Sequence, residues 1–119
     1  MKLVLSTPGR VRLTLRSIRC FGRIWVLATG GRAHLGACSV SSGGKVRTYC
    51  RSGHRDDIVT EAFANRLAAV GLPSLAAGGI HYDDITLNEI ETVIRLADEG
   101  ADAIINVYHN GHVDGGERK

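Results

Sequence analysis

The chain has 119 residues, of which 44% are hydrophobic, and this suits one compact domain better than several. No segment approaches the run of about 18 apolar residues that a membrane span needs. The first residues reach Pro8 and Gly9 too early for a secretory signal, so we expect a cytoplasmic protein that does not enter a membrane. Cys20, Cys38 and Cys50 form no CxxC pair, and their odd number favours reduced thiols.

Charge is divided sharply along the chain. Residues 1–55 contain eleven of the fifteen Lys and Arg residues and no acid, whereas all twelve acids lie between Asp56 and Glu117. A layer built from the first half would attract phosphate groups or an acidic partner. The alternative is a dipolar domain whose two halves meet internally. Nucleic-acid binding is not expected, because Trp25 lies in an apolar run and few exposed aromatic residues remain to stack on bases.

The first half is predicted to form four strands. Alternating residues at 10–16 indicate a half-exposed strand that bulges or ends near Ser17, where the alternation changes phase. The apolar run 24–28 indicates a strand buried on both faces. A third strand at about 33–42 leads through two glycines into a fourth at 45–51, which favours a hairpin. Short connections then predict an antiparallel meander.

The second half changes to helical periodicity. Apolar spacing predicts a first helix from about Asp56 to Val70, and residues 74–81 indicate a fifth strand. A long apolar stripe from Leu87 to Tyr108 predicts a second helix. Thr86 is its expected N-cap, with a glutamate three residues later that completes a capping box.

The order ββββ-α-β-α predicts an α+β fold: an antiparallel β-meander plus a fifth strand, with two helices packed on one face. Residues 1–109 are expected to form a single domain, and residues 110–119 a flexible tail. Gly100 should weaken the long helix by about 1 kcal/mol relative to alanine. The second apolar face of the strand at 24–28 needs cover, from a homodimer through the sheet or from a ligand lying on it.

The first of three polar clusters at element ends is GGRAHLGA, residues 30–37. Glycines such as Gly36 beside His34 let a ligand approach the backbone, and Arg32 supplies a forked cation suited to phosphate or carboxylate. The alternative is a tight hairpin with one histidine at its exit.

The second cluster, Gly53-His54-Arg55, lies where a strand passes into the first helix. Free backbone N–H groups at a helix start favour anions, and His54 and Arg55 add donors there, so the cluster suits a phosphate. Alternatively, Ser52 or Asp56 caps the helix and the basic side chains are solvated.

The third cluster follows the fifth strand. Gly78 and Gly79 either let a neighbouring backbone pack closely or leave room for a flat ring. His81 could donate a hydrogen bond or transfer a proton, and Asp83 could fix its tautomer. The alternatives are that Asp83 and Asp84 compete to cap the long helix, or that His81 is the general base of a small enzyme.

Other chemistries find less support in the sequence. The histidines and Asp83 have no spacing typical of a zinc or iron site, so no metal site is predicted. No serine lies in a nucleophile elbow, and the chain has neither a P-loop nor GxGxxG. We therefore assign no catalytic residue.

Three segments together resemble the LpdD-like family: HLGACSV from His34, GHRDD from Gly53 and GGIHYDDITLNEIE from Gly78. This family is the accessory D subunit associated with gallate decarboxylase, described as a prenylated-flavin chaperone domain with a fold akin to a proteasome-assembly chaperone. The resemblance covers roughly residues 23–108. It is most specific at residues 79–90, which match GIHxDx[IA]TxxEI.

The resemblance implies a protein that binds prenylated FMN, or FMN, and carries or matures this cofactor for its partner. The implied partner is a UbiD-type decarboxylase subunit whose substrate is gallate or another aromatic acid. The resemblance implies no decarboxylation by the chain itself. On this basis we expect phosphate contacts from Arg32, His54 and Arg55, with Gly53 at the helix start. The expected ring contacts are His34, Gly36, Gly79, His81 and Asp83. A cofactor-free assembly module that binds a partner protein subunit is the alternative.

Overall fold

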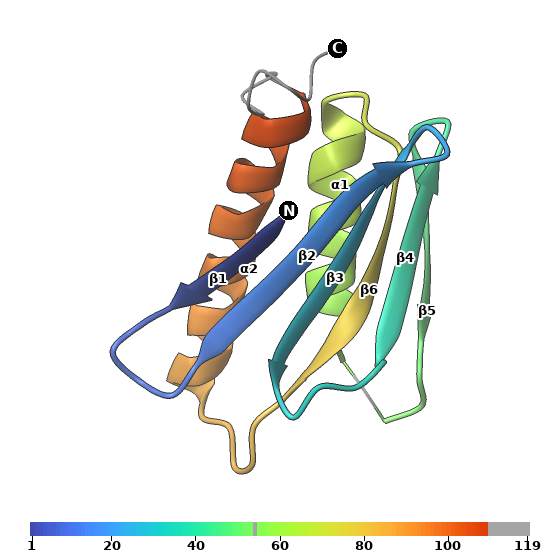
Figure 1. Ribbon diagram of the computed structural model, residues 1–119. Coiled ribbons are helices and arrows are strands. Elements are labelled where there is room, and N and C mark those ends of the chain that lie inside the picture. Colours follow the sequence, from blue (N-terminus) through green and yellow to red (C-terminus); the bar gives the residue numbers. More distant parts are fainter. Residues whose placement is uncertain (54, 110–119) are drawn as a thin grey trace.

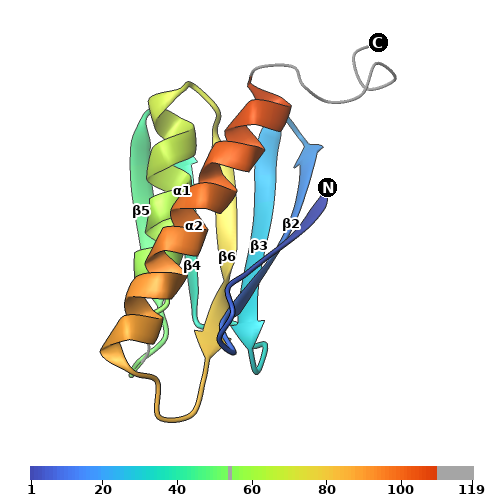
Figure 2. The same cartoon turned by 90° about the vertical axis from the view of Figure 1, so that its left-hand side faces the viewer.

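The protein forms one six-stranded sheet with both helices packed against the same face, an α+β fold as the sequence predicts (Figure 1, Figure 2). The structure is a computed structural model that describes residues 1–53 and 55–109, so His54 and the predicted tail at 110–119 lie outside the described residues. No helix in the described ranges is long and apolar enough to cross a membrane. The elements are β1 (Lys2–Ser6), β2 (Arg12–Cys20), β3 (Arg23–Gly31), β4 (Ala37–Ser42), β5 (Lys45–Cys50), α1 (Asp57–Ala69), β6 (Ser74–His81) and α2 (Leu87–Tyr108).

Strand β6 lies between β3 and β4, which gives the sheet order β1-β2-β3-β6-β4-β5. It pairs with β3 in parallel, and the other neighbouring strands are antiparallel. The predicted meander is therefore wrong at one point, because β3 and β4 are not neighbours. After β5 the chain crosses through α1 and inserts β6 into the sheet, where small residues suit a central strand. The predicted bounds of β6 are confirmed.

Strand β2 is longer than predicted. Strand β1, which was not predicted, pairs with it at the sheet edge. The register between β2 and β3 is unbroken, so the predicted bulge or end near Ser17 is wrong. Alternation changes phase there because Ser17 turns into the core, where its hydroxyl lies 3.1 Å from that of Tyr108. Ile18 then points outward.

Strand β3 is buried on one face only. Ile24, Val26 and Ala28 face the helices, whereas Trp25 and Leu27 are 36% and 44% exposed on the other side. The prediction of a strand buried on both faces is wrong, because both helices cover the same side of the sheet (Figure 2). We call the uncovered side the outer face. Its residues include Arg12, Arg16, Ile18, Trp25, Leu27, Val40, Arg47, Tyr49, Leu75 and Ala77.

The core lies between the sheet and the two helices. Helix α2 begins as predicted, with Thr86 and Glu89 forming a capping box. Gly100 is buried in this helix, and a Cβ built there would overlap Cδ1 of Leu15 on β2. The glycine thus lets the helix approach the sheet closely. The largest fully buried apolar side chains are Phe63, Leu13, Leu15, Ile24, Leu67 and Ile104.

Candidate functional site

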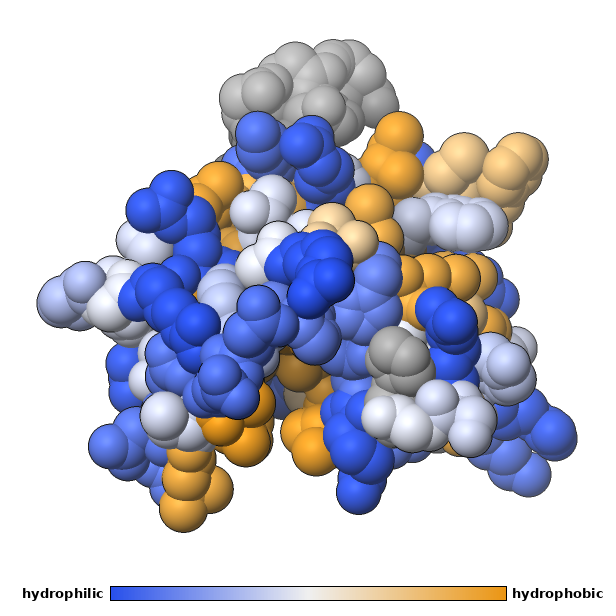
Figure 3. All heavy atoms as spheres, turned by 90° about the horizontal axis from the view of Figure 1, so that it is seen from below, coloured by the Kyte–Doolittle hydropathy of each residue, from blue (hydrophilic) through white to orange (hydrophobic). Residues whose placement is uncertain are grey.

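The connections β1–β2, β3–β4, β5–α1 and β6–α2 all lie at the same end of the molecule (Figure 1). Viewed from that end, the surface is mainly hydrophilic, with scattered hydrophobic residues (Figure 3). Because β3 and β6 are parallel neighbours, their carboxyl ends meet here, with Gly31 opposite His81. The backbone N–H of Arg32 donates to the carbonyl oxygen of His81 at 3.0 Å. The first and third polar clusters are thereby brought together.

The rings of His34 and His81 are neighbours. Their centroids lie 6.3 Å apart, with the planes nearly perpendicular at 80°. The side chain of His34 is 22% exposed and that of His81 is 46% exposed. His34 therefore forms the deeper part of the cluster, and His81 forms its surface.

Asp56, which was predicted only as a possible helix cap, joins this cluster from a third segment. It is the N-cap residue of α1, but its side chain makes no capping hydrogen bond. Instead, Oδ1 accepts from the backbone N–H of Ile80 at 2.9 Å, and Oδ2 lies 3.2 Å from Nε2 of His34. The carboxylate is almost fully buried, at 10% exposure. The one feature of the sequence that could have indicated Asp56 as a site residue is its position directly after the second cluster.

The two histidines differ in what their ring nitrogens contact. Nδ1 of His34 lies 3.1 Å from the carbonyl oxygen of Arg32, and Nε2 faces Asp56, so both nitrogens meet oxygens that can accept a hydrogen bond. His81 meets Asp83 through Nε2 at 3.0 Å. Within the described residues its Nδ1 makes no hydrogen bond. His81 is therefore the imidazole with a nitrogen to offer a ligand.

Two glycines make room for the Asp56–His34 contact. A Cβ at Gly36 would overlap Oδ2 of Asp56. A Cβ at Gly79 would lie 2.6 Å from the carbonyl oxygen of His34 and 2.7 Å from its Nε2. Gly78 serves a different purpose: its φ is 151°, and a Cβ there would overlap the carbonyl oxygen of Ala28. The expected close backbone approach is thus found at Gly78, whereas the space over Gly79 holds the ring of His34.

Asp83 and Arg32 lie at the exposed margin of the cluster. Oδ1 of Asp83 accepts from His81 and lies 3.3 Å from a guanidinium nitrogen of Arg32. The hydrogen bond from His81, followed by the charge of Arg32, holds the pKa of Asp83 below its ordinary value. Asp83 therefore contacts one nitrogen of His81, and the expected fixing of the His81 tautomer stays a prediction.

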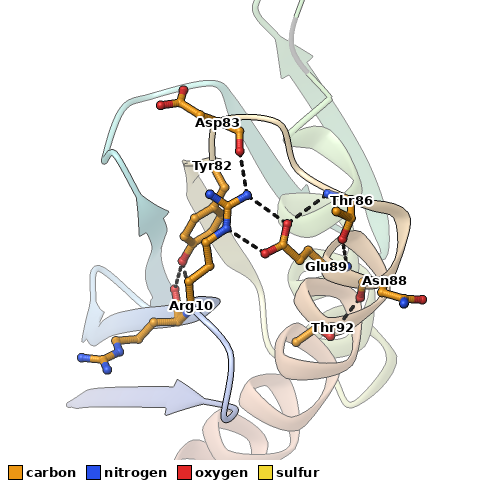
Figure 4. A network of polar contacts seen from close by, with 8 residues as sticks. Arg10, Tyr82, Asp83, Thr86, Asn88, Glu89 and Thr92 are labelled. Atoms are coloured by element: carbon orange, nitrogen blue, oxygen red, sulfur yellow. Dashed lines mark hydrogen bonds and ion pairs between the residues drawn. The ribbon is translucent and has the colours of Figure 1, made fainter.

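Arg10, which was not predicted to belong to the site, holds the β6–α2 loop in place (Figure 4). Its guanidinium makes two hydrogen bonds to the Glu89 carboxylate, at 2.7 and 3.0 Å, and one to the carbonyl oxygen of Asp83 at 2.6 Å. These bonds and those from Thr86 lower the pKa of Glu89 to about 2. Tyr82 adds a second tie, because its hydroxyl accepts from the N–H and donates to the carbonyl of Arg12.

The second polar cluster is only partly described. Gly53 is exposed with φ of 81°. The guanidinium of Arg55 is 76% exposed and donates to Asp57 at 3.2 Å. The neighbouring Asp56 reaches His34 and the backbone of Ile80, but Arg55 pairs with Asp57 at the start of α1. Its expected phosphate contact stays a prediction, as does that of His54, which lies outside the described residues.

The outer face leads from this cluster along β6. Leu75, Ala77, Gly79 and His81 alternate with inward residues, so all four lie on the outer side. A hollow of about 340 Å³ lies on this face, where Arg16, Ile18, Trp25, Leu27, Leu75 and Ala77 contribute to its lining. None of the six strands contains an acid. The outer face therefore combines an apolar centre with positive charge.

A comparison with curated proteins gives no match. The sequence model of one family, described as prenylated flavin chaperone LpdD-like domain, matches residues 7–109. The match covers most of the chain and includes every segment of the cluster.

Proposed function

Since the chain belongs to the prenylated flavin chaperone LpdD-like family, we propose that it binds prenylated FMN, or FMN, at the end of the sheet that carries His34 and His81. It carries or matures the cofactor for a UbiD-type decarboxylase of gallate or another aromatic acid, in the cytoplasm. It does not itself decarboxylate a substrate.

The observation that carries this proposal is the convergence of His34, His81 and Arg32 from two parallel strand ends. The pyrimidine edge of a flavin presents carbonyl oxygens and an N–H, and an imidazole can donate to the former or accept from the latter. Because Nε2 of His81 donates to Asp83, Nδ1 of a neutral His81 is an acceptor and suits the flavin N–H. The donor set therefore fits a flavin, with Asp83 and His34 holding His81 in place.

Two cations suit the flavin phosphate. The side chains of Arg32 and Arg55 are 70% and 76% exposed, and they pair with the carboxylates of Asp83 and Asp57 respectively. Exposed pairs of this kind contribute about 0–1 kcal/mol, so a phosphate that accepts charge-assisted bonds can replace the carboxylate. His54 adds a third donor in the sequence beside Arg55.

When bound by its recipient enzyme, the prenylated flavin supplies the decarboxylation chemistry, and the carrier has to bind, orient and shield it. Leu27 and Ala77 are apolar residues of the outer face close to Gly79, and they suit contact with a ring system. Moderate affinity is expected, because a carrier must also release its cargo.

We also propose that a second copy covers the outer face, giving a homodimer. Trp25, Leu27 and Leu75 form an apolar centre, and arginines of β2 and β5 flank it. An apolar centre with a charged margin is typical of protein interfaces. The same face supports the alternative function, a cofactor-free assembly module that binds a partner protein subunit.

Co-expression with a prenyl-FMN synthase tests the function. Purified wild-type protein should show a flavin absorption spectrum, and mass analysis of the released small molecule should identify prenylated FMN. His81→Ala should lose most of this cofactor. His109→Ala, at the far end of α2, is the matched control and should retain it. A colourless wild-type protein that still co-purifies with a decarboxylase subunit would favour the assembly module.

A further inference from the structure

We infer that Asp56 is the positioning residue of this site: it fixes the tautomer and orientation of His34, and through His34 the position of His81. The ligand concerned rests on the proposed function. The positioning itself rests on contacts within the chain.

The carboxylate of Asp56 connects three segments. It precedes α1, accepts from Ile80 at the end of β6, and meets His34 in the β3–β4 connection. Each of its oxygens contacts a different segment, so rotation of the carboxylate would break one contact or the other. With 10% of the side chain exposed, little water is present to replace a lost bond.

The Asp56–His34 contact is closely packed by two glycines. Gly36 abuts Oδ2 of Asp56, and Gly79 abuts Nε2 of His34, each so closely that a methyl group would not fit. Both ring nitrogens of His34 face acceptors, and the charged carboxylate of Asp56 is a stronger acceptor than the carbonyl of Arg32, so a neutral His34 carries its proton on Nε2. Asp56 thereby determines which nitrogen of His34 is protonated.

The position of His34 affects that of His81, which lies nearer the surface. The centroid of its ring lies 6.3 Å from that of His81, edge to face, and Asp83 contacts Nε2 of His81 at 3.0 Å. A shift of His34 would move one of the two supports of His81. Asp56 therefore acts on the ligand-facing imidazole without reaching the ligand itself.

The substitution Asp56→Asn keeps the size of the side chain and changes only its hydrogen bonding, so it tests whether Asp56 orients His34 through its hydrogen bonds. The amide has one oxygen and one NH₂ group, and the oxygen is needed by the N–H of Ile80. The NH₂ group then faces Nε2 of His34, which must become an acceptor. In neutral His34 the proton moves to Nδ1, where it can be donated to the carbonyl of Arg32.

Nitrogen NMR of the ligand-free protein tests the positioning directly. Wild type and the control Asp98→Asn should show His34 with protonated Nε2, and Asp56→Asn should show it with unprotonated Nε2. Thermal unfolding verifies that each variant is folded, and Gly36→Ala, which displaces Oδ2, provides a second route to the same loss. Protonation of Nε2 in folded Asp56→Asn as in wild type would overturn the inference.

Titration with FMN and with prenylated FMN tests the consequence for the ligand. Asp56→Asn should weaken binding roughly 10- to 100-fold, as found when a group that orients a metal-binding histidine is removed. Asp98→Asn, whose carboxylate pairs with Arg66 and takes no part in the site, should bind within about twofold of wild type. Equal affinities in the two variants would overturn the positioning role at the ligand. If wild type binds no flavin, the proposed function fails, and the NMR result still decides whether Asp56 positions His34.

Discussion

Gly31 of β3 lies directly opposite His81 of β6 in the parallel strand pair. This register is what brings the β3–β4 connection, with Arg32 and His34, against the end of β6. In the predicted meander, β3 would have had β4 as its neighbour, and the two histidines would have had no reason to meet. The insertion of β6 beside β3 therefore creates the site.

Gly79→Ala should disturb the histidine cluster. The added Cβ would lie 2.6 Å from the carbonyl oxygen of His34, so His34 must move. We expect a loss of about 1–3 kcal/mol in the free energy of unfolding, the range for overpacking, together with weaker flavin binding. Urea unfolding and FMN titration measure the two effects. Gly9→Ala, where a Cβ meets nothing within 4 Å, is the control and should change neither. An unaffected Gly79→Ala protein would show that His34 is free to shift.

Gly100→Ala has two opposing effects, and packing should win. Alanine would gain about 1 kcal/mol from helix propensity. However, its Cβ would overlap Leu15, which is 1% exposed and cannot turn into solvent. Overpacking of about 1–3 kcal/mol predicts a net loss of stability, measured by urea unfolding. A gain in stability would mean that α2 can move away from β2.

The Arg10–Glu89 pair should make stability depend on pH. Because the pKa of Glu89 is about 2 in the folded protein and 4.5 in its ordinary state, the pair stabilises the fold above pH 4.5. That contribution is lost as the pH falls from 4.5 towards 2. Arg10→Gln should therefore be less stable than wild type at pH 6, with the difference shrinking at pH 2.5.

Thermal unfolding at both pH values measures this effect. Arg95→Gln is the control, because the Nε of Arg95 lies 4.0 Å from Glu99 in an exposed pair on α2. It should differ little from wild type at either pH. A constant deficit for Arg10→Gln across the pH range would rule out Glu89 as its partner.

Leu27→Asp should prevent the proposed homodimer. Leu27 is 44% exposed at the centre of the outer face, and a carboxylate there would lose its water in the interface. Sedimentation analysis should show wild-type dimers and Leu27→Asp monomers. Ile58→Asp is closely matched, because Ile58 is 43% exposed on α1, away from the outer face. Dimers in Leu27→Asp and monomers in Ile58→Asp would place the interface on the helices.

Arg55→Ala should weaken flavin binding through the phosphate. Loss of a charge-assisted bond predicts a reduction of roughly 1–3 kcal/mol in binding free energy for FMN. Riboflavin, which lacks the phosphate, should bind both proteins equally. Calorimetry with the two ligands provides the comparison. Equal FMN affinity in Arg55→Ala would leave Arg32 and His54 as the phosphate contacts.

Local patterns in the sequence were sufficient for much of the fold. The capping box at Thr86 and the apolar stripe of α2 gave its start and end, and the glycine-rich run gave the bounds of β6. The edge strand β1 was missed because it has five residues and no clear polar alternation. The place of β6 in the sheet depends on pairing between distant segments, which local periodicity does not encode.

The site shows the same division. His34, His81 and Asp83 stood out because they lie beside glycines at element ends. Asp56 did not, because an aspartate before a helix ordinarily caps it. Here the carboxylate oxygens contact Ile80 and His34 instead of the N–H groups of the helix. Arg10 was missed because its partner Glu89 lies 79 residues away in the sequence. The capping box already accounted for Glu89, so no further partner was sought for it.

Amide chemical-shift mapping during titration with FMN tests most directly whether the histidine cluster is the flavin site. Saturable shifts should concentrate on residues 31–36 and 79–83, which β3 and β6 bring together. His81→Ala should lose these shifts while its other resonances stay in place. Saturable shifts confined to the helices, or none at flavin concentrations that saturate a known flavin carrier, would contradict the proposed site.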